Sequence, residues 1–147
     1  MEHFSVEGHP KAQPRVKARA VNQGGKWRAF VYTPTTAKDW KLAVAVEAAR
    51  LDVYYEKDVP LEVRKVFLMP RPKSHYGSRK GEPYLKDSAP KHPTTKPDLD
   101  NLEKAVWDAL NEVLWHDDAQ VVQVYKEKQY AELGVEPGLM MWVQPIG

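Results

Sequence analysis

The start of a helix is marked by the stretch Lys96-Pro97-Asp98-Leu99-Asp100-Asn101-Leu102. Asp100 is a good N-cap residue, and Glu103 three positions later completes a capping-box pattern. Asn111 tolerates left-handed backbone and is the expected C-terminal end. Apolar residues recur at helical spacing between these limits, and the expected buried stripe comprises Leu102, Val106, Ala109 and Leu110. The sequence therefore predicts a helix from about residue 100 to 111.

The segments on either side of this helix predict a mixed architecture of strands and helices. Short apolar runs indicate strands near residues 4–8, 30–32, 61–68, 121–125 and 139–143. Another helical period predicts a helix over about 37–55, and its members are Trp40, Val44, Ala48, Leu51 and Tyr55. The order β-(β)-α-β-loop-α-β-β predicts an α/β (α+β) fold in which a compact mixed sheet packs against two main helices.

Residues 70–97 differ in composition from the rest of the chain. They contain six prolines, seven lysines or arginines and two acidic residues, without a sustained apolar period. Such a composition is typical of a long surface loop. We therefore expect a single domain over residues 1–147, in which residues 70–97 form a flexible, basic, proline-rich loop.

The composition excludes several classes of protein. No apolar run approaches the ~20 residues that a membrane-spanning helix needs. The first ten residues lack a hydrophobic core and include two glutamates, so they are not typical of a secretory signal. The absence of cysteine excludes disulfides and thiolate metal sites, and it fits a reducing cytoplasm, which is the location we expect.

The net charge of +2 conceals an uneven distribution along the chain. Residues 1–97 contain 19 basic and 10 acidic residues, whereas residues 98–147 contain 3 basic and 10 acidic residues. Such segregation indicates that the two parts have different roles. Two ordinary solvated faces would give the same counts, so the charges alone do not choose between these interpretations.

Four aspartates flank the helix predicted over residues 100–111. Asp98 and Asp100 are two positions apart, which places both side chains on the same side of an extended segment. Asp117 and Asp118 follow the helix and precede the next strand. A helix cap and a turn would explain them structurally. The functional alternative is a site for Mg²⁺, which prefers oxygen ligands and activates water for attack on a phosphodiester.

The separation of the two acidic pairs limits how they could cooperate. A straight helix that continued to Leu114 would be about 21 Å long, and the residues after it could not bring Asp118 back to Asp100. If the helix ends near Asn111, the chain is long enough to double back and join the carboxylates within one subunit. The alternative is that a second subunit supplies Asp118. We prefer the first route.

The acidic motif and its surroundings resemble the RusA-type Holliday-junction resolvases, a family of crossover junction endodeoxyribonucleases. The resemblance is carried by Lys96–Leu102, Lys104, Asp108–Asn111, Trp115–Val122 and Lys128, and by the N-terminal stretches Gly8–Arg15 and Tyr32–Pro34. The sequence departs from the family at Glu112, where many members have glycine. It also departs in the long segment over residues 70–97, which the shortest members lack.

The resemblance implies a homodimeric enzyme that cleaves four-way DNA junctions with Mg²⁺, or with Mn²⁺ as a substitute. It also implies a catalytic metal site composed of Asp98, Asp100 and Asp118, with Asp117 as an adjacent ligand. Lys104 would then be a catalytic cation beside the scissile phosphate. The structural alternative for Lys104 is an ordinary ion pair with Asp100 or Asp108, which would contribute little to stability.

Basic residues are expected to bind the DNA backbone from two segments. The N-terminal strip comprises Lys11, Arg15, Lys17 and Arg19. The segment over residues 70–97 contributes Arg71, Lys73, Arg79, Lys80, Lys86, Lys91 and Lys96. The spacing between His75, His92 and His116 does not match that of metal ligands, and we interpret them as loop or turn residues.

The leading hypothesis is a Mg²⁺-dependent, structure-selective endonuclease that resolves four-way junctions by paired symmetric nicks in DNA recombination and repair. One alternative is a nuclease that acts on flaps or other branched DNA. Others are a junction-binding protein with weak or absent cleavage, and an acidic cation-binding domain that never meets DNA. No membrane partner is expected. The candidate residues for a homodimer interface are Trp107, Trp115, Tyr130, Leu139, Met141 and Trp142.

Overall fold

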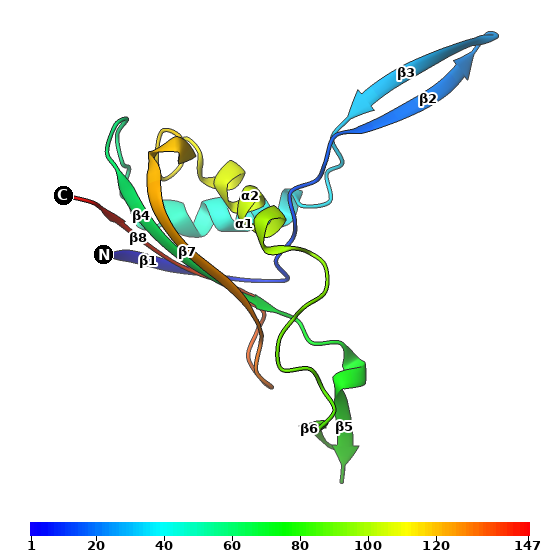
Figure 1. Cartoon of the computed structure of the whole chain (residues 1–147), viewed down its shortest axis with the longest axis vertical. Coiled ribbons are helices and arrows are strands. Elements are labelled where there is room, and N and C mark those ends of the chain that lie inside the picture. The colour runs from blue at the N-terminus through cyan, green and yellow to red at the C-terminus, as the bar shows by residue number, and fades with distance from the viewer.

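A four-stranded sheet with two helices on one face forms the body of the protein, and two hairpins project from it (Figure 1). The computed structural model describes all residues from 1 to 147. The strands are β1 (Glu2–Glu7), β2 (Lys17–Gln23), β3 (Lys26–Tyr32), β4 (Leu61–Met69), β5 (Tyr76–Arg79), β6 (Glu82–Leu85), β7 (Val121–Tyr130) and β8 (Gly138–Pro145). The helices are α1 (Lys38–Ala49) and α2 (Leu99–Leu110), with two 3₁₀ turns, η1 (Lys73–His75) and η2 (Asp118–Gln120). Neither α1 nor α2 has the length and apolar character needed to cross a membrane.

The strand order of the sheet is β1-β8-β4-β7. β4 pairs antiparallel with β8 and parallel with β7, while β8 pairs antiparallel with β1. Alternate side chains of β4 point toward the helices and are apolar except at Lys65. The core lies between the sheet and the two helices, with Trp40 and Val44 from α1 and Leu102 and Val106 from α2. This mixed α+β architecture agrees with the fold class predicted from the sequence.

The predicted strands and helices are all present, although their boundaries differ. α1 ends at Ala49 rather than near Tyr55, and Asp52 then adopts left-handed backbone with a φ of 53°. Beyond that point the Tyr55 N–H donates to the carbonyl of Leu114 at 2.9 Å, which ties the connection to the segment after α2. Leu51 and Tyr55 still pack against the core. Both residues are apolar because they face the core, and this is why they matched the helical spacing although they lie beyond the end of α1.

Each projecting hairpin has a two-residue turn in which both residues have positive φ. These are Gly24 and Gly25 between β2 and β3, and Lys80 and Gly81 between β5 and β6. Such a turn matches the twist of paired strands, and glycine adopts it without steric cost. The segment over residues 70–97, which we expected to be a flexible basic loop, contains η1, β5 and β6. The sequence signal is weak because β5 and β6 have only four residues each.

Hydrogen bonds from outside the β5–β6 hairpin hold the rest of this segment. Arg71 Nη1 donates to the carbonyl of Pro90 at 2.7 Å, which closes the base of the hairpin. Lys128 Nζ, from β7, donates to the carbonyl of Pro97 at 3.0 Å. The chain that leads into α2 is therefore fixed against the sheet.

Half of the residues considered for a dimer interface belong instead to the core of the single chain. The buried ones are Trp115, Leu139 and Met141. Leu139 and Met141 occupy inward positions of β8, and Trp115 lies edge-on to Trp107 with ring centroids 5.4 Å apart. These three side chains are therefore already covered, and an interface would need other residues.

Candidate active site

Asp98 occupies the N-cap position of α2, with extended backbone (φ −73°, ψ 155°). The prediction that Asp100 caps the helix is therefore wrong, because α2 begins at Leu99 and Asp100 lies in its first turn. The predicted capping box is also absent, since Glu103 contacts lysines of the sheet instead. The Asp98 side chain makes no capping hydrogen bond. Its carboxylate remains available to a ligand at the start of α2.

An ammonium group lies between two carboxylates of α2. Lys126 Nζ, from β7, is 2.9 Å from Asp100 Oδ1 and 2.9 Å from Glu103 Oε1. The hydrogen bond from Lys126 lowers the pKa of Asp100 below its usual range. These carboxylates therefore already hold a cation, and Mg²⁺ is bound in proteins by one or two carboxylates with water and substrate phosphate. Asp98 makes no capping hydrogen bond, and its carboxylate with that of Asp100 provides the oxygen ligands that a divalent cation takes, with the remaining ligands from elsewhere.

Behind this pair, Lys65 of β4 is completely buried. Its Nζ is 2.7 Å from Glu103 Oε2 and 3.4 Å from the centroid of the Trp107 ring. Burial lowers the pKa of Lys65 to about 8. Burial also acts to raise the pKa of Glu103, but the ammonium groups of Lys65 and Lys126 outweigh it and hold that pKa below its usual range. A chain of alternating charges therefore runs from the core to Asp100.

Sequence reasoning missed Lys65, Glu103 and Lys126 as members of this site. One signal was present, because Lys65 is a lysine at an inward position of an otherwise apolar strand. The contacts themselves could not have been found, since Lys126 is 26 positions from Asp100 and 23 positions from Glu103 in the chain.

Asp117 and Asp118 lie beyond the other end of α2, at the start of η2. Asp117 caps this turn: its Oδ1 accepts a hydrogen bond from the Ala119 N–H at 2.9 Å, and its own N–H donates to Gln120 Oε1 at 3.0 Å. The Asp118 N–H donates to Asn111 Oδ1 at 3.0 Å. This bond fixes Asp118 beside the C-terminal end of α2.

The Asp117 and Asp118 carboxylates affect each other. Partial burial and the neighbouring Asp117 raise the pKa of Asp118, whereas the Ala119 N–H lowers the pKa of Asp117. A nearby cation favours the charged form of a carboxylate, and it thereby offsets the effects of burial and of a neighbouring negative charge. Perturbed groups of this kind concentrate at functional sites.

Within one chain, the two acidic pairs lie at opposite ends of α2. The helix has 12 residues, so its ends are about 18 Å apart. Nowhere do three histidine, aspartate or glutamate side chains come close enough to hold a metal ion together. The helix ends as expected, with Asn111 as its C-cap, but Asp118 stays bonded to Asn111 instead of returning toward Asp100. The chain does not take the route that we preferred from the sequence.

The departure from the family pattern at Glu112 falls at a backbone position that suits glycine. Glu112 follows the C-cap of α2 and has a φ of 64°. A side chain in this left-handed region costs roughly 1–2 kcal/mol relative to glycine. The chain therefore makes the turn that glycine favours, at a small cost in stability.

Lys104 is exposed on α2, one turn after Asp100. It forms no ion pair with Asp100, which pairs with Lys126, or with Asp108, which pairs with Lys41 of α1. The ordinary helical ion pair considered for Lys104 is therefore not formed. Its ammonium group is free to meet a phosphate near the start of α2.

Most of the basic residues expected to bind DNA are exposed, namely Lys11, Arg15, Lys17, Arg19, Lys73, Arg79, Lys80, Lys86, Lys91 and Lys96. Lys11 and Lys96 line a cavity of about 320 Å³ beside the chain that leads into Asp98. The Arg79 guanidinium lies over the Tyr84 ring, 4.9 Å from its centroid. Two further residues donate hydrogen bonds to backbone carbonyls. Arg71 donates to a backbone carbonyl and lies 4.3 Å from the Tyr130 ring, and Lys86 Nζ donates to a backbone carbonyl at 3.0 Å. Arg71 and Lys86 therefore stabilise the hairpin and also add positive charge to it.

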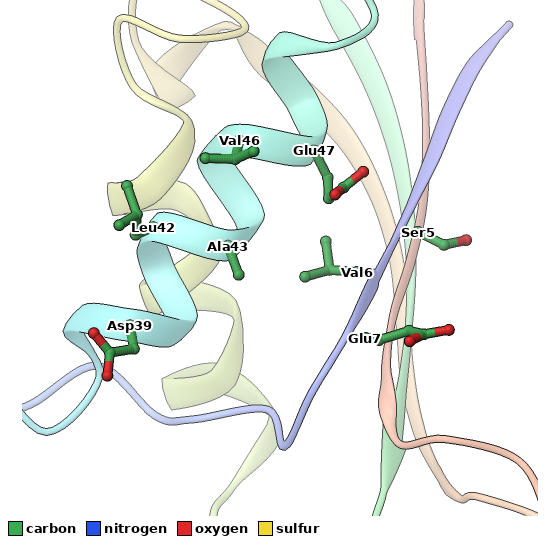
Figure 2. A pocket seen from close by; sticks show the side chains of 8 residues that line it. All are labelled: Ser5, Val6, Glu7, Asp39, Leu42, Ala43, Val46 and Glu47. Atoms are coloured by element: carbon green, nitrogen blue, oxygen red, sulfur yellow. The ribbon is translucent and has the colours of Figure 1, made fainter.

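A wider hollow, of about 620 Å³, lies between β1 and α1, away from both acidic pairs (Figure 2). Its charged lining residues are Glu7, Asp39 and Glu47. Figure 2 shows Asp39 and Glu47 on different turns of α1 and Glu7 directed away from the helix, so the three carboxylates do not converge. Negative charge here repels phosphate, and the hollow is not a candidate substrate site.

Comparison with known proteins bears directly on these features. Residues 7–138 match the protein family described as Endodeoxyribonuclease RusA. The chain is also similar to the uncharacterized protein YqaN of Bacillus subtilis (strain 168), with 36% identity over 148 aligned residues that cover 97% of this chain and 95% of that protein. The matched range contains both acidic pairs, Lys104 and both hairpins. The chain therefore belongs to the RusA family of endodeoxyribonucleases.

Proposed function

We propose that this protein is a Mg²⁺-dependent endonuclease that resolves four-way DNA junctions by paired symmetric nicks. The observation that carries the proposal is the start of α2, where Asp98 and Asp100 lie beside basic surface and where Asp100 already holds the ammonium group of Lys126. Membership of a family of endodeoxyribonucleases supports the same conclusion.

Asp98, Asp100 and Asp118 are the proposed metal ligands, with Asp117 beside them. When bound, a divalent cation lowers the pKa of the attacking water and neutralises charge that develops on the phosphate; Mn²⁺ would serve as a substitute. Lys104 is proposed to neutralise a phosphate oxygen, because its ammonium group has no acidic partner on its own helix. Asp117 also has a structural part, since it caps η2.

A homodimer would bring the two acidic pairs together. The pairs lie at opposite ends of α2, and a two-fold axis that sets two such helices antiparallel places the start of one near the end of the other. Asp118 of one subunit would then complete the site of its partner. The same symmetry would present two equivalent sites to a junction, which needs two opposed nicks to give ligatable duplexes.

A labelled four-way junction and a linear duplex of the same arm sequence test the proposal directly. With Mg²⁺ we expect symmetric nicks in opposing strands of the junction, no cleavage of the duplex, and no cleavage of either in EDTA. A cruciform plasmid should go to linear product within one binding event, and light scattering should give about twice the 16.8 kDa chain mass. A monomeric mass with only nicked circles would contradict resolution.

One observation favours a second candidate, a protein that binds branched DNA with weak or absent cleavage, or that cleaves flaps instead. The acidic pairs are apart within the single chain, so a monomer would lack a complete ligand set. Junction binding without Mg²⁺-dependent nicking, together with a monomeric mass, would establish this alternative.

The β5–β6 hairpin provides a separate prediction about DNA affinity. Replacing Arg79 and Lys80 with glutamine should weaken binding and reduce the slope of log K against log salt by about 1.8, because each lost phosphate contact contributes about 0.9 on duplex arms. Filter binding at several salt concentrations in EDTA measures the slope. The matched control replaces Arg50, the exposed C-cap residue of α1, and Arg64, which is exposed on β4. An equal change of slope in both double variants would show only a general effect of charge.

A further inference from the structure

The β2–β3 hairpin extends away from the body and is covered by nothing (Figure 1). None of its residues is buried, and β2 and β3 pair only with each other. Trp27 next to the turn is 73% exposed, and Val31 is 71% exposed. An isolated two-stranded hairpin is marginally stable in water, and large exposed apolar side chains mark interaction sites. These features indicate a segment built to contact a partner.

The register of the hairpin separates its side chains onto two faces. Residues paired across an antiparallel ribbon share a face. One face carries the pairs Lys17–Tyr32, Arg19–Phe30, Val21–Arg28 and Gln23–Lys26. The other carries Ala18–Val31, Ala20–Ala29 and Asn22–Trp27, without any charge. The first face therefore combines all four cations of the hairpin with two aromatic rings, and Trp27 lies on the opposite face near the tip.

The charge of this region selects one class of partner. Residues 8–38 include seven lysines or arginines and no acidic residue. A protein partner would need an unusually acidic surface, whereas the phosphate backbone of nucleic acid supplies negative charge at every nucleotide. A second copy of this chain that paired cationic face to cationic face would set like charges together, and light scattering in the test below scores any other pairing of copies through this hairpin.

The root of the hairpin is attached to the candidate active site. The Gln13 N–H, just before β2, donates to the carbonyl of Asn101 at 3.0 Å in the first turn of α2. Figure 1 shows both hairpins leaving the body on the side where α2 begins. DNA held along β2 and β3 would therefore pass close to Asp98 and Asp100.

We propose that the β2–β3 hairpin is a DNA-binding arm whose cationic face binds phosphates and whose Trp27 stacks on a base exposed at a branch point. This inference rests on the proposed function and adds the element that distinguishes branched from linear DNA. An indole ring can stack on any base. Bases inside a continuous duplex are stacked on both sides, and only a branch, a gap or an end leaves a base face open. Trp27 therefore contributes to junction binding and not to duplex binding, whereas Lys26 and Arg28 contribute to both.

The test compares the affinity of an immobile four-way junction with that of a long linear duplex, in EDTA so that nothing is cleaved. Trp27→Ala should weaken junction binding by about 5- to 150-fold, the range for one stacked base, and leave duplex binding unchanged. Trp27→Phe should retain most of the junction affinity. The double variant with Lys26→Gln and Arg28→Gln should weaken binding of the junction and of the duplex alike. It should also lower the slope of log K against log salt. The matched control is Tyr125→Ala, which removes an exposed aromatic ring from β7.

Three results would overturn the inference. Trp27→Ala would weaken junction and duplex binding equally, or it would change neither affinity. The third result is a change of the Trp27→Ala variant from dimer to monomer on light scattering, which would show that the arm holds the subunits together. Junction cleavage by the unmodified protein in Mg²⁺ is scored separately. Absence of that cleavage with Trp27-dependent junction binding would refute the proposed function alone, while cleavage with Trp27-independent binding would refute the arm alone.

Discussion

Replacing Asp98 or Asp118 with asparagine is expected to lower junction cleavage by about 10³-fold or more, because each change removes a proposed metal ligand whose cation supplies several kcal/mol of transition-state stabilisation. Both substitutions keep the side-chain volume. Asp98→Asn also keeps a good N-cap residue for α2, and Asp118→Asn keeps the backbone N–H that donates to Asn111 Oδ1. Folding should therefore persist, and junction binding in EDTA should hold or tighten because a negative charge near phosphate is removed.

Mixing the two inactive variants gives a sharper result. If Asp118 completes the site of the partner subunit, a heterodimer of Asp98→Asn and Asp118→Asn chains has one intact site and one doubly altered site. After subunit exchange, nicking should return to roughly a quarter of the normal rate, since about half of the dimers carry one working site of two. The product from a cruciform plasmid should be nicked rather than linear.

The outcome of mixing decides between the two arrangements of the site. If all ligands come from one chain, neither subunit of the heterodimer has an intact site and no activity returns. Exchange must be shown independently, for example by co-purification through a tag on one variant. Near-normal cleavage by either single variant would remove that residue from the proposed ligand set.

Glu103→Gln should destabilise the fold by about 3–5 kcal/mol, because it leaves the buried Lys65 ammonium without a counter-ion. Lys65→Met should be neutral or stabilising, since Glu103 keeps its ion pair with Lys126 and a buried charge is removed. Urea denaturation of the two variants and the unmodified protein measures the difference. Equal destabilisation by Glu103→Gln and Lys65→Met would show instead that the Lys65–Glu103 ion pair is itself the main stabilising interaction.

The same pair predicts a pH dependence. The pKa of Lys65 is about 8 in the folded protein against a usual value of 10.5. Between these two pH values the unfolded chain binds more protons than the folded chain, so Lys65 makes the free energy of unfolding rise with pH. Below about pH 8 both states are protonated, and the unfavourable contribution of Lys65 to stability is constant. Lys65→Met should lack this rise, and comparing the two proteins by urea denaturation across the window isolates it. Parallel pH profiles would refute the assignment.

Local sequence patterns predicted the order of the elements. The apolar period of α2 is strong because five of its twelve residues are apolar and buried, and the inward alternation of β4 is equally clear. The motif from Asp98 to Leu102 and the pair Asp117–Asp118 became candidate metal ligands only through the resemblance to the RusA family, because their spacing alone fits a helix cap and a turn. Boundaries failed where local signals compete. Asp100 is a plausible cap from its neighbours, but α2 begins at Leu99 with Asp98 as its N-cap, and Glu103 contacts the lysines of the sheet.

The charges that contact one another were set by the packing of elements that are distant in the chain. Parallel pairing of β4 with β7 places Lys65 opposite Lys126, and packing of α2 over them sets Glu103 between two ammonium groups. Such contacts join residues far apart in the chain, so no local pattern predicts them. The separation of Asp118 from Asp100 has the same origin, since the bond to Asn111 holds Asp118 at the far end of a rigid helix. The two-faced β2–β3 hairpin likewise depends on a register that its glycine turn fixes and that composition alone does not reveal.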